Sequence, residues 1–205
     1  MFATIDIDQV YVNPSKEHAL EATYQFPLKP DTSLACLEAE LNGKTIVAKV
    51  HDKDKARETY DNAVSAGKAT VLAERSYNTP NSGEMQIKLG NLQPEATMKL
   101  KLKLISQLEI KYGCYQFVVP MTLMPDYNDH GVNADDFPYE FKYSFAIEST
   151  SKLQSIILRE KATLTSKSED GLKAVVEGSE RVKNVVLQWR TNEMLKPHLL
   201  FAKDE

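Results

Sequence analysis

The chain has 205 residues, which is long enough to bury one sizeable core or two small ones. Hydrophobic residues make up 42% of it and charged residues 26%, a balance typical of a folded protein that argues against general disorder. The formal net charge is -4. Because phosphate binding requires a basic face, this charge argues against nucleic acid as the main partner.

No apolar run approaches the length of a transmembrane helix, and no basic stretch followed by an apolar core opens the chain. We therefore expect neither a membrane anchor nor a secretory signal. The two cysteines, Cys36 and Cys114, are too few for a disulfide framework, which predicts two free, partly buried thiols and a cytoplasmic location. A chain from which a signal peptide had been removed would show the same pattern and would be extracellular.

The first 47 residues predict four β-strands. Apolar and polar side chains alternate over residues 4–12 and again over residues 20–28. Asn42-Gly43 lies between two further β-type runs and predicts a tight hairpin, because these residue types accept the positive φ of a primed turn.

A helical period follows over residues 52–66. The apolar residues that recur at helical spacing are Ala56, Tyr60, Ala63 and Val64. We expect this stripe to lie on the sheet. Asp52 is placed to cap the first turn, and Gly67 to adopt the left-handed conformation that ends the helix.

Four more strands are predicted at residues 71–77, 84–89, 97–104 and 115–119, with turns at 78–83 and 90–95. In residues 97–104, apolar side chains alternate with Lys99, Lys101 and Lys103. These lysines form either a basic stripe for an anionic partner or the solvated face of an antiparallel strand. The acidic net charge favours the solvated face.

Several of these segments occur together in the order and spacing of a known family. They are Glu-Ala-Thr-Tyr-x-Phe-Pro-Leu at 21–28, Gly-Lys-Thr-Ile-Val at 43–47 and Ala-Arg-Glu-x-Tyr-x-x-Ala-Val-x-x-Gly-Lys at 56–68, with supporting segments at 9–13, 80–94 and 117–120. In these segments the chain resembles the VIT (vault protein inter-alpha-trypsin) domain. The resemblance implies a mainly β fold, an antiparallel β-sandwich with one amphipathic α-helix. It also implies a module that usually precedes a von Willebrand A domain and that brings no catalytic residues.

Composition and resemblance together predict three regions. Residues 1–124 form the VIT-like β-sandwich domain with its helix at 52–66. Residues 125–138 form an acidic, proline-containing loop or boundary, and residues 139–205 form a second β-rich segment.

The second segment predicts short strands around residues 139–147, 154–159, 162–166, 172–177 and 182–189. Asp170-Gly171 predicts a hairpin turn within it. In the related architectures this segment leads toward a von Willebrand A domain, which would start near Lys196.

Three partial matches to ion- or phosphate-binding motifs fail on residue type or context. Residues 31–35 lack the last hydroxyl of a von Willebrand A metal site, and residues 67–70 end a helix, whereas phosphate loops begin one. Residues 126–131 copy the opening of an EF-hand calcium loop, but His130 replaces an oxygen ligand and Phe137 stands where a glutamate should close the shell. A solvated acidic loop is favoured there over a calcium site.

The remaining reactive residue types form no recognisable site. The histidines are scattered without zinc-ligand spacing, at His18, His51, His130 and His198. Cys36 lies in a predicted strand, where a small buried thiol is commoner than a nucleophile. Glu38 and Glu40 are neighbouring exposed acids without a pocket, and Trp189 and Tyr143 are interpreted as packing residues. We therefore predict no catalytic, cofactor-binding or metal-binding residues.

The strand at residues 4–12 begins abruptly, since VIT-like sequences generally carry another β segment before it. We hypothesise that it is an exposed edge or one that pairs with another molecule. The alternative is that another strand fills the place or that the edge is simply tolerated. A structure with strands of this chain on both sides would exclude the hypothesis.

These observations favour a non-catalytic protein–protein interaction or scaffold module that acts with a von Willebrand A domain, in cis or in trans. The alternatives are a secreted, extracellular-matrix-associated fragment of inter-alpha-trypsin heavy-chain type and an enzyme of an unfamiliar kind. The expected partners are proteins, by β-edge pairing at residues 4–12, and neither nucleic acid nor a membrane.

Overall fold

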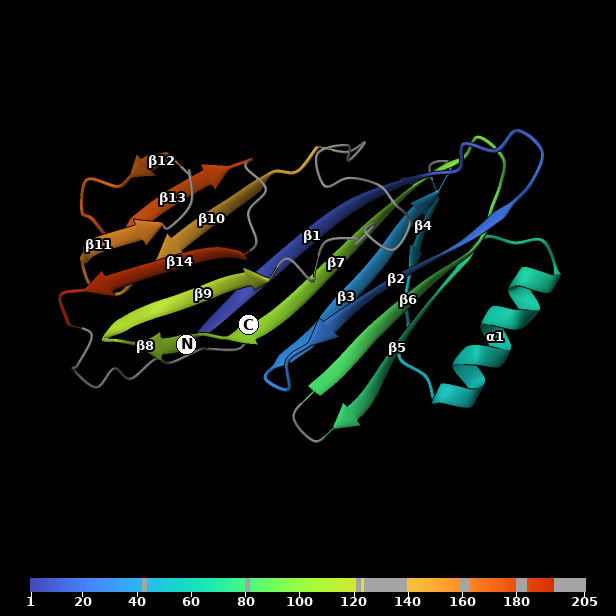
Figure 1. The fold of residues 1–205 in the computed structure, drawn as a ribbon, viewed down its shortest axis with the longest axis horizontal. Helices are drawn as coiled ribbons and strands as arrows, with labels where there is room; N and C mark the ends of the chain where they lie inside the picture. The colour runs from blue at the N-terminus through green and yellow to red at the C-terminus, as the bar shows by residue number, and fades with distance from the viewer. Residues whose placement is uncertain are drawn as a thin grey trace, which may run out of the picture. The chain divides into compact units, whose positions relative to one another are not determined.

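The computed structural model describes residues 1–41, 44–79, 82–120, 123, 140–158, 163–179 and 184–193 (Figure 1). Within these residues the fold is mainly β, with several antiparallel sheets and a single helix, which confirms the predicted fold class. The chain forms two compact units. The first comprises Met1–Gln107 with Leu123, and the second comprises the described residues from 108 to 120 and from 140 onward.

The first unit is an antiparallel β-sandwich built from two sheets. In spatial order, one sheet consists of β1 (Phe2–Val12), β7 (Thr97–Gln107), β3 (Thr32–Leu41) and β4 (Lys44–Val47). The other consists of β2 (Leu20–Leu28), β6 (Ser82–Leu92) and β5 (Thr70–Thr79). Neighbouring strands in both sheets are antiparallel, so each sheet can bury one face and leave the other in water.

The alternation of apolar and polar residues places the core of this unit. Along β7 the buried side chains are Met98, Leu100, Leu102 and Leu104, and the three lysines between them are exposed, as predicted. Along β2 Tyr24 and Phe26 are buried with their ring centroids 4.8 Å apart. The Tyr24 hydroxyl donates a hydrogen bond to the carbonyl of Leu123 at 2.6 Å, so the buried phenol keeps a polar partner.

Strand β3 carries a bulge between Leu34 and Cys36. Leu34 lies opposite Leu104 and Cys36 lies opposite Lys103, so Ala35 is one extra residue on β3. Because of this extra residue, Glu38 and Glu40 point to the same face as the lysines of β7. The hairpin that follows agrees with the prediction in that Leu41 lies opposite Lys44, while Asn42 and Gly43 themselves lie outside the described residues.

Helix α1 (Lys53–Ser65) packs against β5 and β6 (Figure 1). Tyr60 is buried on the side of α1 that faces the sheet, which confirms the predicted stripe. Gly67 ends the helix with φ +70°, and its N–H donates to the carbonyl of Val64 at 2.9 Å. Asp52 occupies the N-cap position, but its side chain makes no capping hydrogen bond, so that detail of the prediction was wrong.

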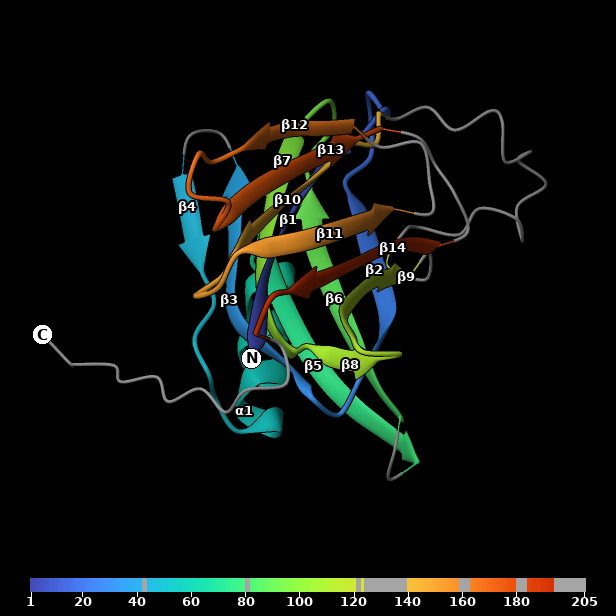
Figure 2. The same cartoon turned by 90° about the vertical axis from the view of Figure 1, so that its left-hand side faces the viewer.

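The second unit also consists of two antiparallel sheets (Figure 2). In spatial order, one sheet consists of β10 (Tyr143–Glu148), β13 (Lys173–Gly178) and β12 (Thr163–Lys167). The other consists of β11 (Leu153–Leu158), β14 (Asn184–Thr191), β9 (Cys114–Pro120) and β8 (Glu109–Lys111). Between β12 and β13, Gly171 adopts φ +72°, which confirms a turn at Asp170-Gly171.

The core of the second unit forms around Trp189. Its indole is 6% exposed and its ring centroid lies 5.6 Å from that of Tyr115 on the neighbouring strand β9. Phe117 on β9 and Phe145 on β10 meet edge to face with centroids 5.9 Å apart, and this contact joins the two sheets of the unit. Trp189 is therefore a packing residue, as predicted.

Two strand assignments differ from the prediction. Residues 115–119 form a strand, but we expected it to be the last strand of the VIT-like domain, and β9 pairs instead with β14 and β8 of the second unit. Alternation along one strand determines its two faces and not its neighbours, so the sequence could not identify this partner. Gly90–Leu92 continue β6, where a turn was predicted. The proposed loop or boundary at 125–138 lies outside the described residues.

Candidate functional site

The candidate site is the open edge of the first sheet, formed by β1. Of the described strands, β1 pairs only with β7, in a regular register from Phe2 opposite Gln107 to Val12 opposite Thr97 (Figure 1). In the part of the chain that the structure describes, no strand lies on its other side. An exposed edge at residues 4–12 would have been excluded by strands of this chain on both sides of β1, and the described part of the chain supplies a strand on one side only.

The hydrogen-bonding direction of β1 follows from one bond at its end. The N–H of Asn13 donates to the carbonyl of Ala96 at 3.0 Å, and these residues face each other in the same register as Val12 and Thr97. In an antiparallel pair, hydrogen-bonded and non-hydrogen-bonded positions alternate, so the odd-numbered residues of β1 bond to β7. The even-numbered residues direct their N–H and C=O groups to the free side. From Phe2 to Val10 these are Phe2, Thr4, Asp6, Asp8 and Val10.

The side chains of β1 give this edge an acidic centre with apolar ends. On the outer face Asp6 and Asp8 are exposed, between Phe2, which is 71% exposed, and Val10, which is 63% exposed. On the inner face alternate residues are half-buried, among them Ile5 and Ile7. A long edge with exposed apolar residues is a template for pairing with another strand, and charges on it restrict which strands can pair.

The lysines of β7 do not make a basic stripe, because acidic residues lie on both sides of them. Lys103 Nζ lies 3.6 Å from a carboxylate oxygen of Asp6, and Lys99 Nζ lies 3.9 Å from one of Glu40. Lys101 lies between Asp8 on β1 and Glu38 on β3. Four carboxylates therefore adjoin three ammonium groups on this face, which supports the interpretation of a solvated strand face.

The other reactive residue types have ordinary surroundings. Cys36 is half-buried and its thiol contacts a carboxylate oxygen of Glu38 at 3.7 Å, while Cys114 is buried, and both thiols are free as predicted. Nε2 of His18 lies 3.9 Å from the carboxylate of Glu17 at an exposed position, and His51 is exposed. His130, His198 and residues 126–131 lie outside the described residues.

Two further sequence matches prove to be structural. The hydroxyls of Thr32 and Ser106 lie 2.8 Å apart in a buried hydrogen bond between β3 and β7, so Thr32 helps to hold these two strands together. Residues 67–70 follow the end of α1, as expected from Gly67. Among the described residues there is no group of three or more metal-ligating side chains. None of the described helices is both long enough and apolar enough to cross a membrane.

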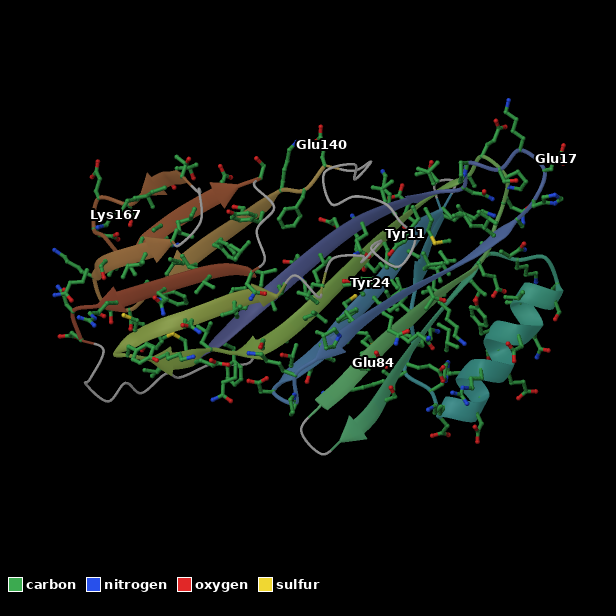
Figure 3. All side chains as sticks on the ribbon, in the orientation of Figure 1. Tyr11, Glu17, Tyr24, Glu84, Glu140 and Lys167 are labelled. Carbon is green, nitrogen blue, oxygen red and sulfur yellow. The ribbon has the colours of Figure 1, made fainter. Side chains whose placement is uncertain are left out.

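Sequence reasoning missed the role of Asn13, directly after β1. Its side-chain amide is 1% exposed and donates to the carbonyls of His18, Leu92 and Gln93 at 2.9, 2.9 and 3.1 Å. Its Oδ1 accepts from the N–H of Ser15 at 2.9 Å. Asn13 therefore fixes the chain where β1 ends. Figure 3 shows Tyr11, which precedes it on β1. Only its place in a family segment marked it in the sequence.

Comparison with known proteins places these features in a family. The family model for the vault protein inter-alpha-trypsin domain matches residues 1–104, which is half of the chain and includes both sheets of the first unit. The match ends within β7 and contains β1 with its free edge.

Two of the three similar proteins described here carry a von Willebrand factor A domain in their names. A von Willebrand factor A domain-containing protein of Dictyostelium discoideum is 25% identical over 203 residues, which is 95% of this chain and 21% of that protein. Human von Willebrand factor A domain-containing protein 5A is 30% identical over 67% of this chain and 19% of its own length. Mouse protein mono-ADP-ribosyltransferase PARP4 is 34% identical over 64% of this chain and 6% of its own length. The chain thus spans about a fifth, or less, of these relatives.

Proposed function

Because this chain belongs to the vault protein inter-alpha-trypsin (VIT) domain family, we propose that it is a non-catalytic protein-interaction and scaffold module that acts with a von Willebrand A domain. The names of the relatives support the association with that domain. The von Willebrand A domain belongs to the same longer protein or to a partner. The two free thiols support the proposed cytoplasmic location, since disulfides persist mainly in oxidising compartments.

One observation carries the interaction role: the free edge of β1. A strand edge that offers unpaired N–H and C=O groups binds an extended segment of another protein by adding it as a further strand of the sheet. On β1 these groups belong to residues that β7 does not engage. The ladder between β1 and β7 remains intact while the edge is occupied.

Proline substitution at an outward-facing position tests this role. Thr4→Pro removes a donor that faces the free side and leaves the bonds to β7 in place, because proline is tolerated at strand edges when its nitrogen faces outward. Val47→Pro is the matched control on β4, at the opposite edge of the same sheet. The N–H of Ala48 donates to Leu37, so the neighbouring Val47 directs its own N–H outward.

The measurement compares the proteins captured from native cells by the parent chain and by the two variants. We expect Thr4→Pro to lose a partner that the parent and Val47→Pro both retain. Identical sets of partners for all three chains, with all three equally stable, would contradict docking at β1.

A further inference from the structure

We propose that the free edge of β1 binds an extended protein segment in which basic and aliphatic residues alternate. This inference rests on the proposed function and specifies the class of partner. It follows from the side chains of β1, from the strand that already pairs with β1, and from the acidic charge along the edge.

Strand β7 shows which side chains β1 accepts from a neighbour. Asp6 lies opposite Lys103 and Asp8 opposite Lys101, while Ile5 and Ile7 lie opposite Leu104 and Leu102. The basic residues of β7 thus meet carboxylates on the outer face, and its leucines meet isoleucines on the inner face. Opposite charges and matched aliphatic side chains at directly opposed positions both stabilise strand pairs.

The same side chains are available to a strand on the other side of β1. Side chains of a strand stand roughly perpendicular to the sheet, so those of an edge strand reach toward either neighbour. The side chain of Asp6 is 65% exposed although Lys103 lies beside it. Asp8 makes no ion pair with the described residues. Both carboxylates therefore remain open to a further cation.

The backbone geometry sets where each kind of side chain would sit. On the free side the even-numbered residues form the hydrogen-bonded pairs, so a basic residue of the partner lies opposite Asp6 or Asp8 at such a position. Ile5 and Ile7 fall at non-hydrogen-bonded pairs, where opposed side chains approach more closely. Aliphatic residues at these positions would bury the half-exposed inner face of β1.

A second copy of β1 fits this edge poorly. Two β1 strands paired antiparallel at full overlap, centred on Ile7, place Asp6 of each copy opposite Asp8 of the other. Four carboxylates then face one another at neighbouring positions, and directly opposed like charges destabilise a strand pair. At full overlap the edge therefore disfavours its own copy, whereas the same carboxylates attract a basic strand.

Three synthetic peptides test the proposal against the full 205-residue chain. The first copies residues 97–107, the sequence of β7. The second replaces its three lysines with glutamate, and the third has the composition of the first in scrambled order. We measure affinity at low and moderate salt, together with amide hydrogen exchange along β1 by NMR. The chains compared are the parent, Thr4→Pro, Val47→Pro and the double variant Asp6→Asn/Asp8→Asn.

We expect the lysine peptide to bind the parent about tenfold more tightly than either other peptide, because two cross-strand charge pairs are attractive only with lysine. Its binding should slow exchange at Thr4, Asp6 and Asp8, whose amides face the free side. Thr4→Pro should abolish binding and Val47→Pro should leave it unchanged. Asp6→Asn/Asp8→Asn should reduce the preference for lysine over glutamate to about twofold or less.

The outcomes separate the partner class from the proposed function. Equal binding of all peptides, preference for glutamate, or no binding would overturn the alternating basic class. In each of these cases, loss of a cellular partner by Thr4→Pro would still support docking at β1. Concentration-dependent self-association that slows exchange at the same amides would instead identify a second copy as the occupant. If Thr4→Pro changes neither peptide binding nor the captured partners, the proposed docking role fails as well.

Discussion

The phenol oxygen of Tyr60 lies over Gly90, so close that a Cβ added to Gly90 would be 2.7 Å from it. Helix α1 therefore rests on the one residue of that part of β6 that has no side chain. Val64 Cγ2 would lie equally close to the added atom, so two turns of the helix meet the strand at the same point. The rest of α1 exposes mainly charged side chains to solvent. A few apolar side chains therefore hold the helix to the sheet.

Replacing the Tyr60 ring should therefore destabilise the first unit. We expect Tyr60→Ala to lower the free energy of unfolding by about 3 kcal/mol, because the buried ring is lost and a cavity remains between α1 and β6. Urea denaturation of the parent and the variant measures the change. A variant with the same free energy of unfolding as the parent would show that the ring contributes nothing to packing.

The same residue predicts a change in stability at alkaline pH. Burial, which is the largest cause, and the nearby carboxylates of Glu21 and Asp61 raise the pKa of Tyr60 to about 12. The unfolded chain ionises this group near its ordinary value of about 10, so its contribution to stability is complete below that pH and is lost as pH rises toward 12. We expect the parent to lose stability over this range more steeply than Tyr60→Phe.

Tyr60→Phe also serves as the control for the ring. In the described part of the chain the buried Tyr60 hydroxyl has no hydrogen-bond partner, so its removal should change stability at neutral pH by less than about 1 kcal/mol. Parallel loss of stability by parent and variant between pH 10 and pH 12 would contradict the raised pKa.

Asn13 should be the most sensitive polar residue of the first unit. Asn13→Ala removes the donor for three backbone carbonyls, at least one of them buried, and should cost about 3 kcal/mol. Asn13→Asp keeps the shape but replaces the donating amide with an acceptor, so it should also destabilise, and more strongly at neutral than at acidic pH. Thermal unfolding at pH 4 and pH 7 measures both variants. An aspartate variant as stable as the parent would contradict this account.

The acidic neighbours of Lys101 predict a salt-dependent effect. Lys101→Glu places a third carboxylate between Asp8 and Glu38 and should destabilise the sheet by about 1 kcal/mol at low ionic strength. High salt should reduce the loss, because exposed charges are screened. Lys101→Gln removes the charge without adding repulsion and is the matched control. Equal stability of the two variants at low salt would contradict the cross-strand arrangement.

Features that depend on residues close together in the chain were predictable from the sequence. The alternation in residues 20–28 and 97–104 determined the buried faces of β2 and β7, and Gly67 ended the helix where a left-handed residue was expected. These features depend on neighbours along the chain, which the sequence displays directly.

Features that depend on distant partners were not predictable in the same way. Strand β9 pairs with β14, whose residues are roughly 70 positions away, and nothing in the alternation of β9 selects this partner over β7. Asn13 bonds to carbonyls that only the folded chain brings near it. No residue within β1 itself indicated that this strand lies at the edge of its sheet, because alternation along one strand does not show how many neighbours the strand has.

The bulge in β3 also sets where the length of this strand can change. Leu34 and Cys36 already face consecutive residues of β7, so deletion of Ala35 would join them into an unbroken ladder with every later side chain on its present face. A one-residue deletion between Cys36 and Leu41 would instead turn side chains over, carrying carboxylates toward the core. Related sequences whose β3 is one residue shorter should therefore lack the residue that corresponds to Ala35, because its deletion leaves the faces of all other side chains unchanged.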